Sequence, residues 1–485
     1  MVGQGTRSLL FRAMSDVEFR RKTGAHFVVL LRALKDAFFK FRKGPITAES
    51  THTFECSIET IVREFARSFM QWSLGSLESE TTAAMPPTIF YCDDPYRRLP
   101  DKTSHSHILT RFGDIALERT VYRRGSRGKV ISPLEKILGI ECGATPGARD
   151  FIGLQVAAAG ASQERCVEAI AERTGTRIGH EKLRNISALL AESMEPHREV
   201  CQLAQLQEWI DEAATRGKNI VLSVSRDGVS LGMAPFANFE MASVSTLSVY
   251  SEGKRMGTVY IAAAPEENQA TLTQKLTSLL TGIIRARGTK LARIVYVTDA
   301  GKVETAYWKN VLRKLYVDGQ RIKIDRILDY YHASERLTAI ADSLKLTTHQ
   351  RSEWLSRMRK LLLEPGGWGR MMRSVAAMKK KYGVKKSKSK SFADAKRYLH
   401  RYRKFMNYAE QRDQGCPIGS GIVESACKQI VTERMKLSGM RWKHLGAQHV
   451  MTLRSILLSQ TWQPTFRLAL LAFPPVTTLC LSQTQ

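Results

Sequence analysis

The sequence predicts a mixed α/β protein with a sheet core, a large all-helical insertion and a mostly helical N-terminal region. The first observation is a change of period, because apolar residues follow helical spacing near the start and strand-like runs begin at residue 219. The second is the segment 346–415, which has almost no strand pattern and is rich in Arg, Lys, Met and Leu. The 485 residues correspond to about three domains, which leaves room for all these parts.

The first region is predicted to span residues 1–146. Apolar side chains recur at helical spacing in 19–41 and in 56–75, which predicts two helices. Residues 106–124 alternate in polarity around the turn Phe112-Gly113-Asp114, which predicts a small β-hairpin.

Residues 147–200 are predicted to form three short helices. Ser162 is the predicted N-cap of the second helix, and Gly175 marks its end. Short helices joined by a Gly-containing turn are compatible with a helix-turn-helix DNA-binding unit, and equally with an ordinary three-helix packing unit. Both interpretations remain open on this pattern.

Strand and helix patterns alternate in the next part of the chain, in the order β-β-β-α-β-α-β-α. The strands are predicted at 219–225, 243–251, 256–264, 293–297 and 326–329, and the helices at 266–287, 303–316 and from about 332. This is the order of the ribonuclease H-like fold, a mixed sheet flanked by helices. We expect such a core in 201–345 and 416–460, interrupted by a basic all-helical insertion at 346–415 and followed by a C-terminal tail at 461–485.

Two aspartates stand where strand patterns end, Asp227 after the first and Asp299 after the fourth. The first and fourth strands are neighbours in a ribonuclease H-like sheet, so these carboxylates would lie side by side. Two close carboxylates repel each other unless a cation neutralises them, and Mg²⁺ or Mn²⁺ accepts carboxylate and phosphate oxygens. Two such ions about 3.5–4 Å apart can activate a water or a 3′-hydroxyl against a phosphodiester. Either aspartate alone is also an ordinary turn former.

Glu424 is the candidate for a third acid. It lies in the glycine-containing run 417–428, which would bring a helix close to the sheet and place this charge near the helix start. The alternative is an ordinary i,i+4 pair with Lys428. Arg226 places a cation directly before Asp227, which would lower the pKa of that aspartate or mark a decayed copy.

Three segments together resemble a known family: Asp227-Gly228, Val297-Thr298-Asp299 and the run 418–442 (IGSGIVESACKQIVTERMKLSGMRW). They are similar to the DDE transposases of the Kra-type bacterial insertion sequences, relatives of the Mutator-like group. The long run is the specific part of the match, and the resemblance covers roughly 105–460. Some relatives carry cysteine-based zinc motifs near the N-terminus, and this sequence has no pair with that spacing.

The resemblance implies a transposase that cuts DNA at the ends of its element and joins these ends to new target DNA. Asp227, Asp299 and Glu424 would be the catalytic triad that holds two Mg²⁺ (or Mn²⁺) ions. Asp329 and His332 resemble the acidic-x-x-His signature of the same group and are candidates for active-site support. A lone histidine is more often a surface or capping residue, and here it would orient an active-site group or bind a phosphate.

The charge of the chain indicates a polyanionic partner. There are 74 Lys and Arg against 46 Asp and Glu, a formal net charge of +28. Residues 366–408 contain fourteen Lys and Arg and a single acid, Asp394, with aromatic residues between them. The predicted DNA-binding residues are Lys379, Lys380, Lys381, Lys385, Lys386, Arg397, Arg401 and Arg403 in this stretch, and Lys428, Arg434, Lys436, Arg441, Trp442 and Lys443 beyond it. The alternative is a solvated basic face whose aromatic residues, Trp442 included, fill the core.

The expected partner is double-stranded DNA, bound by a homodimer or higher oligomer because two element ends must be held together. The sequence has no transmembrane run, no secretory signal and no CxxC spacing among its eight cysteines, so we expect a cytoplasmic, nucleoid-associated protein. Two alternatives remain: a ribonuclease H-like nuclease without transposition, and a catalytically inactive DNA-binding protein derived from a transposase.

Overall fold

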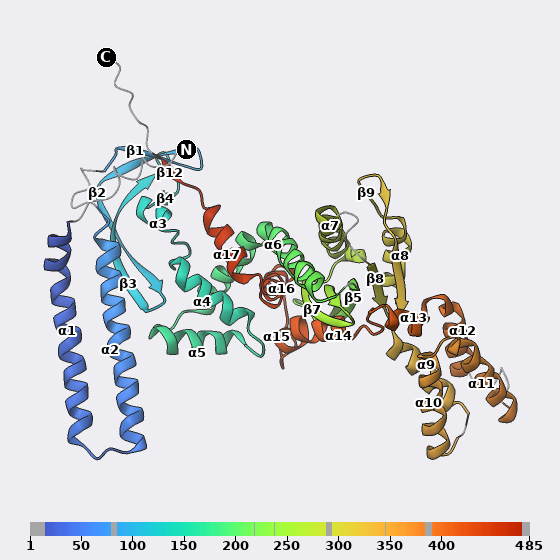
Figure 1. Cartoon of the computed structure of the whole chain (residues 1–485). Helices are drawn as coiled ribbons and strands as arrows, with labels where there is room; N and C mark the ends of the chain where they lie inside the picture. Colours follow the sequence, from blue (N-terminus) through green and yellow to red (C-terminus); the bar gives the residue numbers. More distant parts are fainter. Residues whose placement is uncertain are drawn as a thin grey trace. The chain divides into compact units, whose positions relative to one another are not determined.

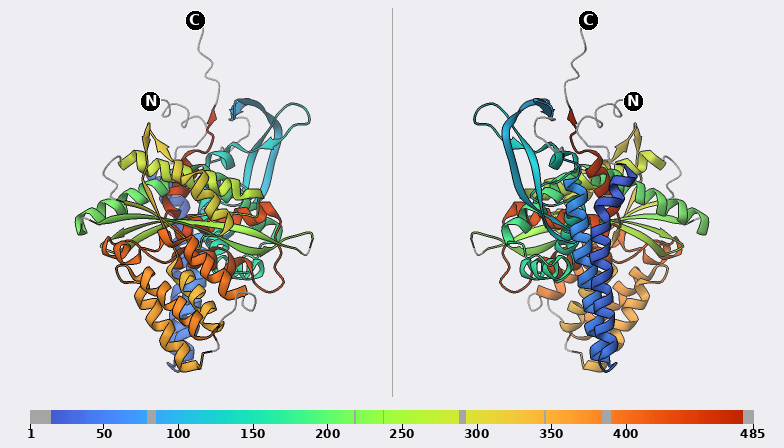
Figure 2. Two further views of the ribbon diagram at one scale, coloured as in Figure 1. Left: turned by 90° about the vertical axis from the view of Figure 1, so that its right-hand side faces the viewer. Right: turned by 90° about the vertical axis from the view of Figure 1, so that its left-hand side faces the viewer.

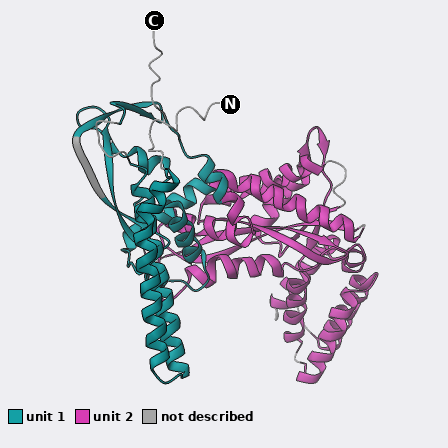
Figure 3. Ribbon diagram, turned by 60° about the vertical axis from the view of Figure 1, so that its left-hand side comes forward, with its two compact units in different colours: residues 1–194, 466–485 teal, residues 195–465 magenta. Residues whose placement is uncertain are grey.

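The computed structural model describes residues 15–78, 85–217, 219–236, 238–287, 293–344, 346–383 and 390–477. The chain divides into two compact units, with 1–194 and 466–485 in unit 1 and 195–465 in unit 2 (Figure 3). Unit 1 is therefore built from both ends of the chain, and unit 2 from its middle.

Unit 1 begins with a helical hairpin of two 28-residue helices, α1 (Asp16–Lys43) and α2 (Ala48–Gly75), which lie side by side (Figure 1). A five-stranded sheet follows, in the order β12-β1-β2-β3-β4. Its strands are β1 (Thr88–Tyr91), β2 (Asp94–Thr110), β3 (Gly113–Arg123), β4 (Val130–Ile131) and β12 (Val476–Thr477). The sequence predicted only the β2–β3 hairpin, because the other three strands have two to four residues and are too short to show alternation.

The remaining helices of unit 1 include the three that were predicted after residue 146. They are α3 (Pro133–Ile137), α4 (Pro146–Ala157), α5 (Gln163–Thr174) and α6 (His180–Arg216). The capping prediction for α5 is confirmed: the Ser162 side chain accepts a hydrogen bond from the Arg165 N–H, and Gly175 ends the helix in the left-handed region at φ 71°. The prediction of a short third helix is wrong, because α6 continues through Pro196 for 37 residues, and the boundary between the units falls inside it.

Unit 2 contains a five-stranded mixed sheet in the order β11-β8-β5-β6-β7. Its strands are β5 (Ile220–Gly232), β6 (Phe239–Ser251), β7 (Lys254–Ala263), β8 (Arg293–Thr298) and β11 (Ile324–Leu328). β5, β6 and β7 pair antiparallel, whereas β8 runs parallel to β5 and β11 runs parallel to β8. The predicted mixed α/β class is confirmed at this level.

Helices and short elements connect and cover this sheet. They are η2 (Glu267–Gln269), α7 (Ala270–Arg287), α8 (Lys302–Asn310), η4 (Leu312–Lys314), β9 (Tyr316–Val317), β10 (Gln320–Arg321), α9 (Tyr330–Asp342), α10 (Thr348–Leu362), α11 (Gly367–Lys381), α12 (Lys390–Arg401), η5 (Arg403–Phe405), α13 (Tyr408–Asp413), α14 (Gly421–Cys427), the π-helical turn η6 (Lys428–Thr432), α15 (Glu433–Met435), α16 (His444–Leu458) and α17 (Trp462–Leu471). The predicted helix 303–316 ends at residue 310, and a two-stranded ribbon, β9–β10, follows it.

Buried apolar side chains form one layer on each face of the unit 2 sheet. On one face α6 and α7 pack against residues such as Leu222 and Val224. On the other, α9 to α12 pack against Val295, Val297 and Ile327. Figure 2 shows helices above and below the green strands of this sheet. Because side chains alternate along each strand, a residue's face decides which helices it meets.

Candidate metal and DNA site

Three aspartates lie at one level across three neighbouring strands of unit 2. β8 pairs with β5 at an offset of 72 positions (296 − 224) and with β11 at an offset of 30 (328 − 298). Asp299 is 72 positions after Asp227 and 30 positions before Asp329, so continuing the two registers places Asp299 level with both of them. A backbone hydrogen bond of 2.9 Å from the Asp329 N–H to the Thr298 carbonyl supports this alignment. The sheet therefore gathers these acids where the parallel strands end.

Asp227 does not end its strand, which corrects the predicted boundary at residue 225. β5 continues to Gly232 because β6 pairs with it along its whole length, whereas pairing with β8 stops at Val224. Asp227 thus lies just beyond the residues of β5 that pair with β8, and its own backbone pairs only with β6. Its Oδ1 accepts a 2.7 Å hydrogen bond from the Gly228 N–H.

Arg226 does not lower the pKa of Asp227. Its guanidinium lies on the opposite face of the sheet, donates to Thr273 Oγ1 at 3.1 Å and sits 4.6 Å from the centre of the Tyr307 ring. The alternation of side chains along β5 therefore separates this cation from the next residue.

The pKa of Asp227 is instead raised to about 6. Burial is the main cause, a hydrogen bond from the Gly228 N–H partly offsets it, and the negative charges of Asp299, Glu304 and Glu424 raise it further. The negative charges of three other acids therefore act on Asp227 and make its ionisation less favourable.

Asp299 follows β8 directly and is held by the turn into α8. Its Oδ1 accepts a 2.8 Å hydrogen bond from the Gly301 N–H, and its carbonyl oxygen accepts one of 2.6 Å from the Tyr398 hydroxyl on α12. The basic helical segment is thereby connected to the acidic site by its own side chain.

Glu304, in the first turn of α8, is an acid that the sequence reasoning missed. It is buried, and burial together with the nearby charge of Asp299 raises its pKa. The only signal in the sequence is an acid five residues after a strand-end aspartate, a spacing that is common without any site.

Glu424 lies in the first turn of α14, a helix that contacts β5 and β6. Its Oε1 lies 3.0 Å from the Ser420 hydroxyl, and that hydroxyl is also 2.5 Å from Asp329 Oδ2. A hydroxyl has one proton, so at any moment only one of the two carboxylates receives it. The shorter contact favours Asp329 and leaves Glu424 exposed and able to accept another partner.

Asp329 and His332 form a tight ion pair at the start of α9. Asp329 is fully buried, accepts a 2.8 Å hydrogen bond from the His332 backbone N–H and is also bonded by the backbone N–H of Ser420. Burial opposes its charge, but the hydrogen bonds from His332 and Ser420 prevail and lower its pKa to about 2. His332 Nδ1 lies 3.4 Å from the carboxylate, and the interaction with Asp329 raises the pKa of His332 to about 9.

Among the described residues, one group of three possible metal ligands has its ligand atoms all within 4.8 Å of one another: Asp329, His332 and Glu424. The predicted triad Asp227, Asp299 and Glu424 is coupled through charge but does not meet that mutual distance. Asp329 and His332, which were expected only as support, thus lie within ligand distance of Glu424.

The predicted DNA-contacting residues after Glu424 divide into two groups. Lys428, Lys436, Arg441 and Lys443 are exposed. Arg434 and Trp442 are not at the surface: they are 1% and 9% exposed, the guanidinium stacks on the indole at 5.5 Å, and the Trp442 Nε1–H donates to the Met435 carbonyl at 2.8 Å. Trp442 therefore lies in the core, as the alternative interpretation of the basic segment predicted, and not on a DNA-binding surface.

The basic segment presents a charged outer face over an aromatic core. Lys380, Lys381, Arg397, Arg401 and Arg403 are exposed, and Lys379 is half-buried. Arg397 pairs with Asp394 at 3.3 Å. Lys385 and Lys386 lie outside the described residues. The aromatic residues turn inward, with Phe392, Tyr402 and Tyr408 in the core.

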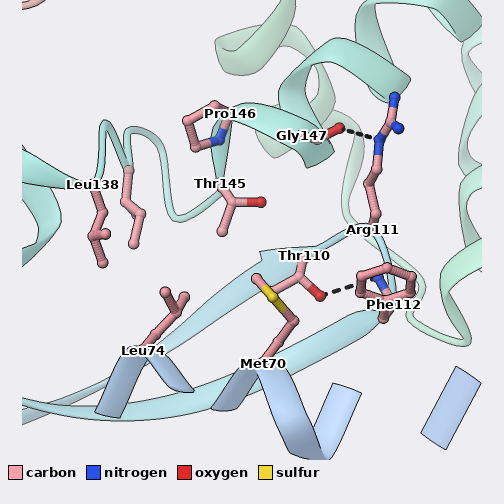
Figure 4. Close-up of a pocket in the computed structure, with 10 residues that line it drawn as sticks. Met70, Leu74, Thr110, Arg111, Phe112, Leu138, Thr145, Pro146 and Gly147 are labelled. Carbon is pink, nitrogen blue, oxygen red and sulfur yellow. Dashed lines mark hydrogen bonds between the residues drawn. The ribbon is translucent and has the colours of Figure 1, made fainter. Parts of the chain in front are cut away.

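A separate hollow of about 240 Å³ lies in unit 1, between α2, the β2–β3 turn and the start of α4 (Figure 4). Arg111 Nε donates to the Gly147 carbonyl at 2.9 Å, and the Phe112 N–H donates to Thr110 Oγ1 at 3.0 Å, so the rim is fixed. The Arg111 guanidinium is also engaged by Asp150 at 2.6 Å. The remaining lining is mostly apolar, and this hollow offers no acid–base or nucleophilic chemistry.

No protein-family model matches the chain, and none of the curated proteins compared with it is similar at a significant level. In the parts of the chain that the structure describes, no helix combines the length and the apolar character needed to cross a membrane.

Proposed function

We propose that the protein is a DDE transposase of an insertion sequence, which binds terminal inverted repeats and catalyses metal-dependent DNA cleavage and strand transfer. Unit 2 would be a ribonuclease H-like core that carries the basic helices α10–α13 as an insertion, in a cytoplasmic, nucleoid-associated protein. Support for this fold comes from the strand order, in which the first three strands form an antiparallel meander and the fourth pairs parallel to the first. The sequence prediction that Asp227 and Asp299 lie side by side required the first and fourth strands to be neighbours, and β5 and β8 are neighbours.

The alignment of Asp227 with Asp299 beneath the helix of Glu424 is the observation that carries the proposal. Buried carboxyl groups with a raised pKa, as Asp227 and Glu304 have, are costly for folding and are suited to binding a cation. The neighbouring tyrosine contact brings the basic α12 to the same edge, where a negatively charged strand would approach.

The donor set fits a hard divalent cation, because the three acids that raise the pKa of Asp227, which are Asp299, Glu304 and Glu424, all offer carboxylate oxygens. Asp227, Asp299 and Glu424 would hold Mg²⁺ or Mn²⁺, and Glu304 is close enough to Asp299 to share in this. When bound there, two such ions supply an activated water or 3′-hydroxyl and stabilise the leaving oxygen of a phosphodiester.

The chain's own residues prepare this site. Ser420 fixes the start of α14 on Asp329 and thereby sets where Glu424 lies. The Asp329–His332 pair holds the first turn of α9 in place. The positive charge of His332 balances the negative charge of Asp329, so this pair adds no net negative charge beside the other acids. Exposed cations of α11, α12 and η6 would bind the phosphate backbone, and α4–α6 are the candidate helix-turn-helix for the repeat sequence.

The test uses the purified full chain, Mg²⁺ and a plasmid that carries the DNA flanking the gene. Asp227→Asn, Asp299→Asn and Glu424→Gln are each expected to abolish cleavage and joining. Glu353→Gln, an exposed acid on α10, is the matched control and should behave as the wild type.

Two results would replace this proposal. Cleavage without joining, lost in the same three variants, would indicate a ribonuclease H-like nuclease that does not transpose. DNA binding with no cleavage by the wild type would indicate an inactive, transposase-derived DNA-binding protein.

A further inference from the structure

The turn between β8 and α8 contains a residue in an unfavourable backbone conformation. Ala300, directly after Asp299, has a φ of 66°, in the left-handed region that residues other than glycine seldom adopt. It is also buried. A conformation of this kind persists where the surrounding structure enforces it. The contacts around Ala300 therefore help to decide where Asp299 lies.

Side chains and amides of the turn itself make three of these contacts. The Gly301 N–H donates to Asp299 Oδ1 at 2.8 Å. The Ala300 N–H donates to Thr298 Oγ1 at 3.2 Å, and Thr305 Oγ1 donates to the Ala300 carbonyl at 3.2 Å. The first of these bonds orients the carboxylate, and it depends on the conformation of Ala300. If φ at this residue became negative, the Gly301 N–H would turn away from the Asp299 carboxylate.

The backbone of Asp299 is also held from α12, 99 positions further along the chain. The Tyr398 hydroxyl donates to the Asp299 carbonyl at 2.6 Å. Burial raises the pKa of Tyr398, so the hydroxyl keeps its proton and remains a donor. The Tyr402 ring lies 4.9 Å from the Tyr398 ring between centres, and the Arg336 guanidinium lies 4.8 Å from it, so the donor itself is fixed.

Tyr402 of α12 lies against the same turn. Its hydroxyl is 3.5 Å from the Ala300 carbonyl oxygen, a long hydrogen bond, and its side chain is buried. The Arg326 guanidinium of β11 lies 5.6 Å from the centre of the Tyr402 ring and donates to Thr305 Oγ1 at 2.9 Å. Tyr398 and Tyr402 are about one helical turn apart, so α12 reaches two successive carbonyl groups of this turn.

We propose that Tyr398 is a positioning residue of the metal site: its hydroxyl keeps Ala300 in the left-handed conformation and thereby holds the Asp299 carboxylate where a divalent cation binds. Tyr398 acts through the backbone and touches neither cation nor substrate. The inference rests on the proposed metal site and adds that this site depends on α12. The exposed cations Arg397 and Arg401 lie on the same helix, so the surface proposed for DNA and the position of Asp299 depend on one element.

The experiment measures Mn²⁺ binding by the metal-free full chain without DNA, from the electron paramagnetic resonance signal of free Mn²⁺. Asp299→Asn should abolish the tightest binding and so assigns it to the site. Tyr398→Phe keeps the ring and removes the hydroxyl, and it should weaken Mn²⁺ binding by about tenfold, as is usual when the support of a metal ligand is lost. The matched control is Tyr122→Phe, which loses a 2.6 Å hydrogen bond to the Pro86 carbonyl in unit 1 and should bind Mn²⁺ like the wild type.

A second substitution separates positioning from a general contribution to stability. Glycine adopts the left-handed conformation without support, so Ala300→Gly should restore Mn²⁺ affinity when it is added to Tyr398→Phe. A hydrogen bond that only joins α12 to the core would not be replaced by this change. Cleavage by Tyr398→Phe should likewise recover when the Mg²⁺ concentration is raised, because the acids themselves are intact.

The outcomes distinguish this inference from the proposed function. Equal Mn²⁺ affinity of Tyr398→Phe and the wild type, or a double variant that binds no better than Tyr398→Phe, would overturn the positioning role and leave the metal site standing. A lower Tm of Tyr398→Phe in EDTA at unchanged Mn²⁺ affinity would assign the hydroxyl to stability alone. A wild type that binds no Mn²⁺, or binding that Asp299→Asn leaves intact, would overturn the proposed metal site together with this inference.

Discussion

Asp227 and Asp299 lie level with each other because β5 and β8 pair at an offset of 72 positions, which is also their separation in the sequence. The closeness of the two acids is therefore a property of strand register and not of any local motif. A slip of one residue between these strands would turn one of the two carboxylates to the opposite face of the sheet.

Asp227→Asn is expected to stabilise the metal-free protein while it abolishes cleavage. The pKa of Asp227 is raised from 3.8 to about 6, mainly by burial, so the folded state resists its ionisation. This cost is absent below pH 3.8 and complete above about 6, where it amounts to about 2–3 kcal/mol. Urea unfolding at pH 7.5 in EDTA would measure the gain.

The pH dependence provides the control for that variant. Wild type and Asp227→Asn should have equal stability near pH 3.5 and diverge as the pH rises through 6. Mg²⁺ should raise the Tm of the wild type alone. A variant that is less stable than the wild type at pH 7.5 would contradict the electrostatic explanation.

His332→Gln is expected to destabilise the protein in a pH-dependent way. The pKa of His332 is raised to about 9 by Asp329, so the pair contributes fully below about 6.5 and loses its contribution as the pH rises through 9. The pKa of Asp329 is lowered to about 2, so the contribution also disappears in strong acid. We expect a loss of about 1–2 kcal/mol between pH 4 and 6.5.

Thermal melts from pH 4 to 10 would record the difference between His332→Gln and the wild type. His349→Gln, an exposed histidine on α10, serves as the control and should show no such trend. A difference that stays constant up to pH 10 would mean that the ring acts through packing alone.

Removing three exposed cations from the basic segment should reduce the salt dependence of DNA binding. The variant Lys380→Ala, Arg401→Ala, Arg403→Ala is expected to lower the slope of log K against log[salt] by about 3, since each phosphate contact contributes about one unit. Fluorescence anisotropy between 50 and 200 mM salt would measure it.

The matched control removes three exposed cations near the β9–β10 ribbon, Arg313, Lys314 and Lys323. That variant has the same loss of net charge and should keep the wild-type slope. Equal slopes for both triple variants would show that total charge matters and that α11–η5 has no special part in binding.

Trp442→Ala should affect stability and not base stacking. Its indole is 9% exposed and hydrogen-bonded to Met435, so we expect a loss of about 3–5 kcal/mol in unfolding free energy. Arg441→Ala, its exposed neighbour, should change stability by less than about 0.5 kcal/mol but weaken DNA binding. A stable Trp442→Ala variant with impaired DNA binding would contradict the core position.

The sequence was sufficient for the order of the main elements of unit 2. The strand β8 is an apolar run that Asp299 follows directly, so pattern alone locates that residue. Asp227 lies inside β5, which continues to Gly232, and the predicted end of that strand was wrong. Strands of two residues, such as β9 and β12, carry no periodicity and could not be predicted.

The site required tertiary contacts that no pattern encodes. Ser420 meets Asp329 across 91 positions, and Glu304 becomes important only because the α8 turn folds back on Asp299. Arg434 and Trp442 are residue types that are common in DNA-binding helices. Only their packing in the structure shows that both side chains are buried. The position of Arg226 on the opposite face from Asp227 follows from the alternation of side chains along β5.

The last strand, β12, completes the sheet of unit 1 by pairing with β1, and Val476 joins the cluster of Ile89, Tyr96 and Tyr122. During synthesis, every residue of unit 2 is therefore translated before the strand that closes unit 1. A nascent chain that stops short of residue 476 would keep all its acidic ligands but leave the edge of β1 open, a template on which unfinished chains can aggregate.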